Sequence, residues 1–248
     1  MGCPGRMEEL RPTILLTRPR AQATRFADAF AARFGPDWRV LISPLIEVRP
    51  VALAQDPARF AGLIFTSQNG VAAFAAQVTG RDWPVWCVGP QTTEAARAAG
   101  FRARDAGGNA TDLAAKVRGA GPWLWLHGQH VKADLAETLT LAGTDTIGAM
   151  IYRQDEAGLD PEAARVLRSD QPVIVPLFSP RSAGLFQSAA RRAVAPLWIA
   201  ALSKPVAAAL TLPLARLTIA DQPNGNAMLD AIGGLIRAER LEGGATAR

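Results

Sequence analysis

The sequence has few of the residues on which metal and disulfide chemistry depend. It contains only two histidines and two cysteines among 248 residues. His127 and His130 lie three apart, and a metal site would need at least a third ligand. Cys3 falls in an N-terminal leader and Cys87 in a predicted buried strand, which does not favour a disulfide. We therefore predict neither a metal centre nor a disulfide.

Long apolar runs and the short motifs of familiar enzyme classes are also missing. No stretch approaches the roughly 18 apolar residues that span a bilayer, and the N-terminus lacks the apolar core of a signal peptide. We expect a cytoplasmic protein that binds no membrane, in which residues 1–12 are a loose leader and Met1 or Met7 is the start. Without GxGxxG, GxxxxGK[ST] or GxSxG, the nucleotide-binding and serine-hydrolase classes lack their signatures.

The charge is basic but does not by itself identify a partner. The net charge is +5 and the sequence pI about 10. Arginines carry most of it and are scattered, without a run or interleaved aromatic residues, so we expect no nucleic-acid binding. Arginine forks suit carboxylates and phosphates, which favours an anionic small molecule. Arginine-rich usage in a GC-rich genome explains the composition equally well.

What the sequence does have is a three-part pattern that occurs twice. Each part is a short apolar run, a turn rich in hydroxyl groups and glycine, and an alanine-rich helical stretch, which is a strand–loop–helix unit. Ser67 and Ser179 correspond at an offset of 112 residues, and the offset between corresponding residues grows only slightly in the later parts of the pattern. The pattern indicates two parallel α/β domains with a cleft between them. The first copy comprises 63–70, 85–101 and 106–117, and the second comprises 173–186, 197–210 and 217–232.

The order of the elements predicts that one domain is inserted into the other. The strand–helix unit 13–41 and the segment 158–240 are each incomplete, and we expect them to form one discontinuous domain. Residues 57–147 have a full set of elements and form the inserted domain. Residues 42–56, which contain two prolines, and 148–157 are expected to be linker strands. The predicted fold is therefore two flavodoxin-like parallel α/β domains joined by a two-stranded linker, with a central cleft.

Polar turns at the predicted strand ends allow two interpretations. Ser or Thr before an alanine-rich helix caps the free N–H groups of its first turn, and this is the simpler interpretation of any single turn. Several helix N-termini facing one cleft also form an anion-binding surface from N–H groups and dipoles. Tyr152, the only tyrosine, lies in the second predicted linker. It is expected either to donate a proton to a leaving group or to pack the linker against a domain.

These motifs, in their order along the chain, resemble those of uroporphyrinogen-III synthase. No single motif is specific, but the order and spacing of the series are, and the resemblance covers residues from about 13 to 237. It implies the same two-domain fold, with the first strand–helix unit in the C-terminal domain. The matching segments are TRP at 17–19, SPLIEVRP, GLIFTSQNGV, CVGPQTTEAARAAGF, GGNATDLA, MIYRQ and FSPRSAGLF.

The resemblance implies a lyase of haem, sirohaem and cobalamin biosynthesis. Its substrate, hydroxymethylbilane, is a linear tetrapyrrole with eight carboxylates. The enzyme expels the terminal hydroxyl as water, inverts ring D through a spiro intermediate and closes the macrocycle. No cofactor is implied, because the pyrroles stabilise the azafulvene cation themselves, and Tyr152 matches the usual candidate acid. The residues we expect around the carboxylates are Arg18, Ser67, Thr92, Ser179, Ser182, Ser203 and Lys204.

The chain departs from the family pattern at two positions. Val206 stands where a threonine is common, and His127 stands where an arginine is frequent. Backbone N–H groups then carry the substrate contacts, or Ser203 and Lys204 compensate, or the chain is a weakened or non-catalytic relative. The alternative function is thus a non-catalytic two-domain module that binds an anionic small molecule. We expect a monomer, because closing a cleft requires its two domains to move against each other.

Overall fold

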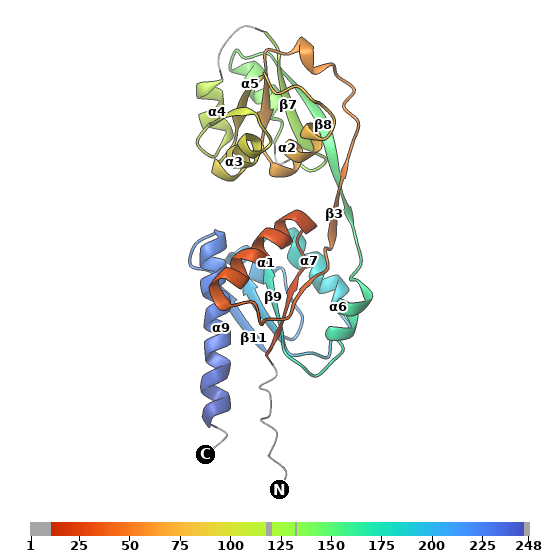
Figure 1. Ribbon diagram of the computed structural model, residues 1–248, viewed down its shortest axis with the longest axis vertical. Coiled ribbons are helices and arrows are strands. Elements are labelled where there is room, and N and C mark those ends of the chain that lie inside the picture. Colours follow the sequence, from red (N-terminus) through yellow and green to blue (C-terminus); the bar gives the residue numbers. More distant parts are fainter. Residues whose placement is uncertain (1–10, 118–120, 132, 246–248) are drawn as a thin grey trace. The chain divides into compact units, whose positions relative to one another are not determined.

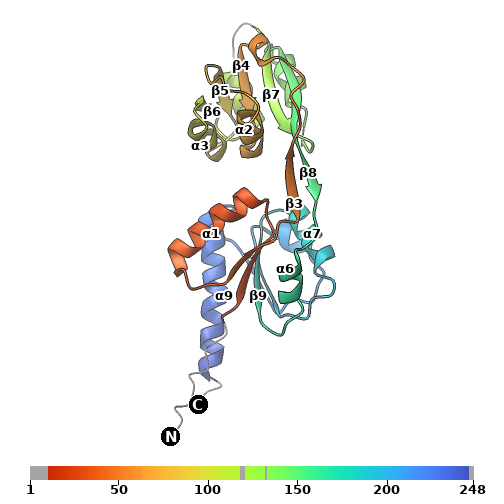
Figure 2. The ribbon, with the colours of Figure 1, turned by 45° about the vertical axis from the view of Figure 1, so that its right-hand side comes forward.

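The computed structural model describes residues 11–117, 121–131 and 133–245. The chain divides into two compact units, of which unit 1 comprises residues 1–47 and 156–248 and unit 2 comprises residues 48–155. Each unit is a β-sheet with helices on both faces (Figure 1 and Figure 2). Most of the predicted leader, with Cys3 and Met7, lies outside the described residues.

The sheet of unit 1 has five parallel strands in the order β11-β10-β9-β1-β2. Residues 13–16 thus pair with the C-terminal strands, and Thr13 lies opposite Val173. Counted along the chain, the order from β2 is 2-1-3-4-5, as in flavodoxin. The strands are β1 (Thr13–Leu16), β2 (Val40–Ile42), β9 (Val173–Leu177), β10 (Leu197–Ala201) and β11 (Arg216–Ile219).

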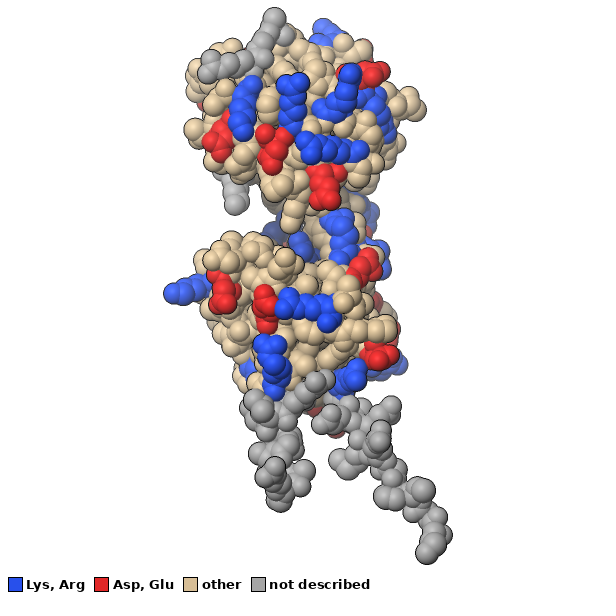
Figure 3. Space-filling model, turned by 60° about the vertical axis from the view of Figure 1, so that its left-hand side comes forward, with Lys and Arg blue, Asp and Glu red and all other residues tan. Residues whose placement is uncertain are grey.

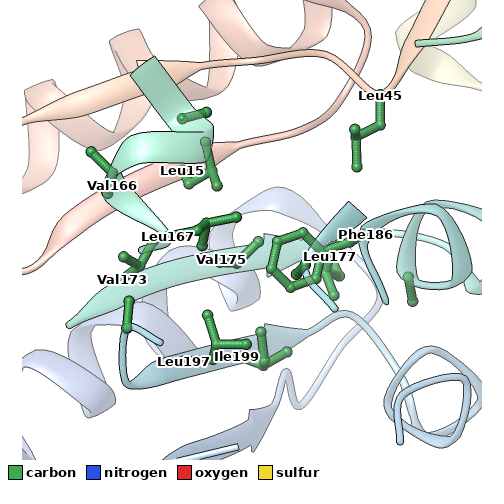
Figure 4. Close-up of a cluster of buried hydrophobic side chains, with 14 of the residues drawn as sticks. Leu15, Leu45, Val166, Leu167, Val173, Val175, Leu177, Phe186, Leu197 and Ile199 are labelled. Atoms are coloured by element: carbon green, nitrogen blue, oxygen red, sulfur yellow. The ribbon is translucent and has the colours of Figure 1, made fainter. Parts of the chain in front are cut away.

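Helices cover both faces of this sheet because its strands are apolar on both sides. On one face, α1 (Arg20–Phe34) and α9 (Gly225–Ala245) pack against Ile14 and Leu16. On the other face, α6 (Pro161–Val166), α7 (Pro180–Ala189) and α8 (Lys204–Ala208) pack against Leu15 and Val175. Figure 4 shows this second core, in which Phe186 of α7 lies against the strand side chains.

The sheet of unit 2 has six strands in the order β3-β8-β7-β4-β5-β6. The five strands from β4 to β8 are parallel. Numbered 1 to 5 along the chain and read from β6, their order is 3-2-1-4-5, which is the Rossmann type of doubly wound sheet. β3 is the edge strand, and the bonds Val51 N to Ile151 O (2.8 Å) and Ala157 N to Leu45 O (3.1 Å) show that it runs antiparallel to β8. The strands are β3 (Ile46–Pro50), β4 (Gly62–Phe65), β5 (Pro84–Cys87), β6 (Arg102–Asp105), β7 (Trp123–Gly128) and β8 (Thr146–Glu156).

Helices of unit 2 also lie on both faces. The short 3-10 helix η1 (Pro57–Arg59) precedes β4. α2 (Gln68–Ala75) and α3 (Pro90–Ala98) share a core with Phe65, whereas α4 (Ala110–Lys116) and α5 (Leu135–Leu141) share one with Ile64 on the opposite face. The predicted parallel α/β class is therefore confirmed. No helix in the described part of the chain has the length and apolarity that a membrane span requires.

The second predicted linker, 148–157, differs from what the structure contains. Ala149, Ile151 and Tyr152 are buried in the core of unit 2, and β8 is paired with β7 as far as Tyr152. Because these residues pair with β7, the sheet of unit 2 extends beyond residue 147. The chain passes from one unit to the other at residues 47–48 and 155–156.

Arg81 joins the ends of two helices in unit 2. Its guanidinium donates hydrogen bonds to four carbonyl oxygens at distances from 2.6 to 3.1 Å, and it lies 4.8 Å from the centroid of the Phe101 ring. A cation there also complements the negative ends of the α2 and α3 dipoles. The four carbonyls belong to Ala75, Val78, Gly80 and Ala99.

We predict that Arg81→Met lowers the free energy of unfolding of unit 2 by about 2–3 kcal/mol, because it leaves part-buried carbonyls without a charged donor. Urea unfolding measures the change. Arg59→Met is the matched control, since Arg59 is exposed in η1, and we expect it to change stability by less than about 0.5 kcal/mol. Equal effects of the two substitutions would contradict this role of Arg81.

Candidate functional site

The winding direction of the chain reverses once in each sheet. In unit 1 the reversal lies between β1 and β9, and in unit 2 between β4 and β7. The helices that follow the two strands of each pair, α1 and α7 or α2 and α5, cover opposite faces. Open parallel sheets bind ligands outside the carboxyl ends of the strands at such a switch point. We therefore take these two strand ends as the candidate site in each unit.

Arg18 lies at the switch point of unit 1, directly after β1. Its guanidinium carbon is 3.9 Å from the ring centroid of Phe178, which directly follows β9 and makes an edge contact with Phe26. Burial, and then repulsion from Arg25, lowers the pKa of Arg18 to about 10. The side chain is still a cation at neutral pH, so it is a partly desolvated positive charge suited to a carboxylate.

Two predicted serines of unit 1 cap a helix. The Oγ atom of Ser179 accepts from the N–H of Ser182, while Ser182 Oγ accepts from the N–H of Ser179, both at 3.1 Å. This reciprocal pair is a capping box at the start of α7. The hydroxyls therefore fix the turn beside Arg18, which is the simpler of the two interpretations of this motif.

The turn after β10 holds its polar groups differently. Ser203 precedes α8 and makes no side-chain capping bond, and Lys204 next to it is exposed. Val206 is only 1% exposed and packs in the core of unit 1. A valine is well suited to that apolar position.

Two predicted residues of unit 2 lie after β4 and β5. Ser67 caps α2, its Oγ accepting from the N–H of Asn69 at 3.1 Å. Thr92, in the first turn of α3, is buried with 6% of its surface exposed. Gln68 Nε2 donates to Gln91 Oε1 at 3.4 Å, which links the two turns. Only the first turn is beside the switch point.

An irregular step in the β7–β8 ladder directs Tyr152. His127 pairs with Met150, but the next residue, Gly128, pairs with Tyr152, so Ile151 is an extra residue on β8. Such a bulge re-aims side chains and is common beside active sites. As a result Ile151 and Tyr152 both contribute to the core that contains Phe65, and Tyr152 is only 7% exposed.

Two glycines make room for the tyrosine ring. A Cβ atom on Gly128 would lie 2.4 Å from Tyr152 Cζ and 2.7 Å from its hydroxyl oxygen. A Cβ on Gly70 would lie 3.1 Å from the carbonyl oxygen of Leu126 and 3.8 Å from Tyr152 Cε1. The ring therefore occupies the space that side chains at these positions would fill. Its hydroxyl is held against the backbone at the carboxyl end of β7.

Sequence reasoning did not place His127 in the site, but the structure puts it at the carboxyl end of β7. Its ring stacks on Trp125, with centroids 4.3 Å apart and planes inclined by 32°. The signal was present in WLWLH (123–127), since residues two apart on a strand share a face.

The described residues contain no group of three or more His, Cys, Asp or Glu that could hold a metal ion. Cys87, at the end of β5, is a buried free thiol. Burial raises its pKa to about 12, so it is protonated at neutral pH and is no nucleophile.

Comparison with known proteins identifies relatives. The family model described as uroporphyrinogen-III synthase HemD matches residues 27–230. The crystal structure of uroporphyrinogen-III synthetase from Helicobacter pylori 26695 is similar, with a TM-score of 0.63 and 19% identity, covering 91% of this chain and 100% of that one. A mutant uroporphyrinogen III synthase from Thermus thermophilus has a TM-score of 0.49 and 16% identity, covering 93% and 99%. No curated protein matches in sequence.

We predict that Gly128→Ala displaces the ring of Tyr152 and lowers the free energy of unfolding by about 2 kcal/mol, as overpacking of a core does. Because the chain has one tyrosine, labelled tyrosine gives one set of ring NMR signals, and these should shift. Gly158→Ala is the control, since nothing lies within 4 Å of a Cβ there. Unchanged ring signals in the Gly128 variant would refute the contact.

Proposed function

Because the chain belongs to the uroporphyrinogen-III synthase family, we propose that it is the cyclising lyase itself. It converts hydroxymethylbilane to uroporphyrinogen III with inversion of ring D and loss of water. The observation that carries the proposal is the desolvated cation Arg18 at the switch point of unit 1, together with the family match over residues 27–230. An anionic substrate is the ligand that such a charge favours.

The substrate carboxylates are bound by residues of the strand-end turns in each unit. Arg18 provides the fixed charge, Lys204 an exposed ammonium group, and Ser203 a hydroxyl that caps no helix. Elsewhere the backbone N–H groups of the turns take part, because Ser67, Ser179 and Ser182 cap helices. The proposed binding residues are Arg18, Ser67, Thr92, Ser179, Ser182, Ser203 and Lys204.

Tyr152 supplies the proton that the leaving hydroxyl needs. Hydroxide is a poor leaving group, so the C–O bond breaks when the oxygen receives a proton and departs as water. The hydroxyl of Tyr152 suits this role because Gly128 and Gly70 leave room for its ring at the carboxyl end of β7. The remaining azafulvene cation is stabilised by the pyrroles, so the mechanism uses no cofactor.

The proposed enzyme is a cytoplasmic monomer that binds neither nucleic acid nor membrane. On the face drawn in Figure 3, acidic side chains are interspersed with the basic ones in each unit. Ion pairs such as Arg39–Glu162 (2.7 Å) and Arg49–Asp155 (3.2 Å) neutralise part of the positive charge. This mixture favours a small anionic substrate over a polymeric anion such as nucleic acid.

A non-catalytic module that binds an anion is the second candidate. The observation that favours it is the engagement of Ser67, Ser179 and Ser182 in helix caps, with a buried valine at position 206. Such a module would retain the anion-binding turns without turning the substrate over.

The isomer of the product separates these two functions. Supplied with enzymatically made hydroxymethylbilane, the protein is expected to give uroporphyrinogen III, which is distinguished from isomer I after oxidation and chromatography. Isomer I forms spontaneously, so a reaction without protein is the control. Isomer I alone would reject the enzyme and leave the binding module.

Two substitutions separate proton donation from binding. Tyr152→Phe removes the donor and should lower kcat by about 10- to 100-fold with little change in KM. Lys204→Ala should mainly raise KM, and by less at high salt, where its attraction for the substrate is already screened. Steady-state kinetics at two ionic strengths measures both. Full turnover to isomer III by Tyr152→Phe would reduce Tyr152 to a packing residue.

A further inference from the structure

A cavity of about 290 Å³ lies in unit 1, where helices α6 and α7 end. α7 begins after the carboxyl end of β9, and the chain beyond it leads to the amino end of β10, which is parallel to β9. The end of α7 therefore lies at the amino ends of the strands. Because the switch point of unit 1 lies at their carboxyl ends, the cavity is separate from the candidate site.

Three arginines line this cavity, which we call the arginine cavity. Arg168 follows α6, and Arg191 and Arg192 follow α7. All three are exposed, and none of their side chains forms a hydrogen bond or an ion pair with the residues that the structure describes. No aspartate or glutamate is among the described residues that line the cavity. Three guanidinium groups therefore share one cavity without a counter-charge.

The acids nearest to these arginines along the chain are engaged elsewhere. Asp160 caps α6, its carboxylate accepting from the N–H of Ala163 at 2.7 Å. Glu162 pairs with Arg39 at 2.7 Å. Asp170 accepts a hydrogen bond from the side-chain amide of the next residue at 3.2 Å. Neutralising the arginine cavity is therefore left to a ligand.

The arginines do not serve as caps of the two helices. Basic side chains near a helix end commonly donate to its last carbonyl groups, as Arg81 does in unit 2. Here other donors occupy those carbonyls. The carbonyl of Leu167 accepts from the N–H of Val194 at 2.8 Å, and that of Val166 accepts from both the N–H and the hydroxyl of Ser169. The guanidinium donors remain available to an anion.

The charge and the walls of the cavity indicate the class of ligand. Guanidinium forks suit phosphate and carboxylate oxygens. A phosphate monoester has about −1.5 to −2 charges at pH 7 and three strong acceptor oxygens, which matches three arginines better than the single charge of a carboxylate. The remaining walls include the apolar side chains of Leu159, Ala164 and Leu167. The volume lies near the lower end of the roughly 300–1,000 Å³ typical of small-molecule sites.

From these observations we propose that the arginine cavity binds a small organic phosphate monoester. The phosphate lies among the guanidinium groups of Arg168, Arg191 and Arg192, and the organic part lies against the leucine and alanine side chains of the walls. This site is a second anion site at the opposite end of the sheet from Arg18. The inference does not depend on the proposed function.

Isothermal titration calorimetry of the full chain with phenyl phosphate tests the proposal. We expect one site with a Kd below about 1 mM. Arg168→Gln and Arg192→Gln should each raise the Kd about tenfold, because each removes one charge-assisted hydrogen bond. Arg165→Gln is the matched control, since Arg165 is exposed on α6 but does not line the cavity. It should change the Kd by less than about twofold at 0.15 M salt.

Two further probes separate the charge from the apolar walls. Inorganic phosphate lacks the organic part, and benzoate has a ring but only a carboxylate, so each should bind at least about tenfold more weakly than phenyl phosphate. Ala189→Leu leaves the charge unchanged and places a larger side chain in the cavity. Ala189 is exposed at the end of α7, so the variant should fold and lose the binding.

The location of binding is checked by amide NMR of the labelled protein. Phenyl phosphate should shift the amides of residues 167–169 and 188–194, and oxidised uroporphyrin III, an octacarboxylate, should not displace it. No binding at about 10 mM phenyl phosphate, equal effects of Arg165→Gln and Arg168→Gln, equal affinity for inorganic phosphate, or displacement by uroporphyrin III would each overturn the proposal. Absence of isomer III from the cyclisation assay would reject the proposed enzyme and leave this site intact.

Discussion

The reversal of winding in each parallel sheet is the constraint on which the candidate site depends. A strand–helix–strand connection must place its helix on one face of the sheet, and both faces are apolar. The chain therefore winds first in one direction and then in the other, and the two strands at the reversal have their following helices on opposite faces. Their carboxyl ends are left open to a ligand. Arg18 lies at that point in unit 1, and Ser67 and His127 lie there in unit 2.

The polar residues of the strand ends serve the fold and the proposed chemistry through the same contacts. Ser67 and Ser179 satisfy the first N–H groups of α2 and α7 and so fix the turns that follow the strands. Fixed turns hold the remaining backbone N–H groups in place, and a preorganised donor costs little reorganisation when an anion binds. Arg18 adds a charge that is partly desolvated against Phe178 and is therefore more effective than an exposed one.

Much of the fold follows from periodicity in the sequence. The repeated strand–turn–helix pattern predicts parallel α/β architecture, and Phe26 and Phe30, one turn apart, predict the buried face of α1. The strand order of unit 2 could not be predicted from the sequence. Hydrophobic periodicity does not show on which face of the sheet each connecting helix lies, and that choice decides the strand order. The orientation of Tyr152 depends on the bulge at Ile151. A bulge arises from the register between two paired strands, so the sequence of either strand alone does not predict it. The alternation in β7 places Trp125 and His127 on one face of the strand. No sequence motif, however, indicated that their rings stack.

The central claim is that the anion binds at the switch-point strand ends, and amide NMR of the uniformly labelled protein tests it most directly. On titration with oxidised uroporphyrin III, the account predicts that the largest shifts in unit 1 fall on the amides that follow β1 and β9, and in unit 2 on those that follow β4 and β7. Shifts concentrated at the amino ends of the strands, or on the helices away from these turns, would contradict it.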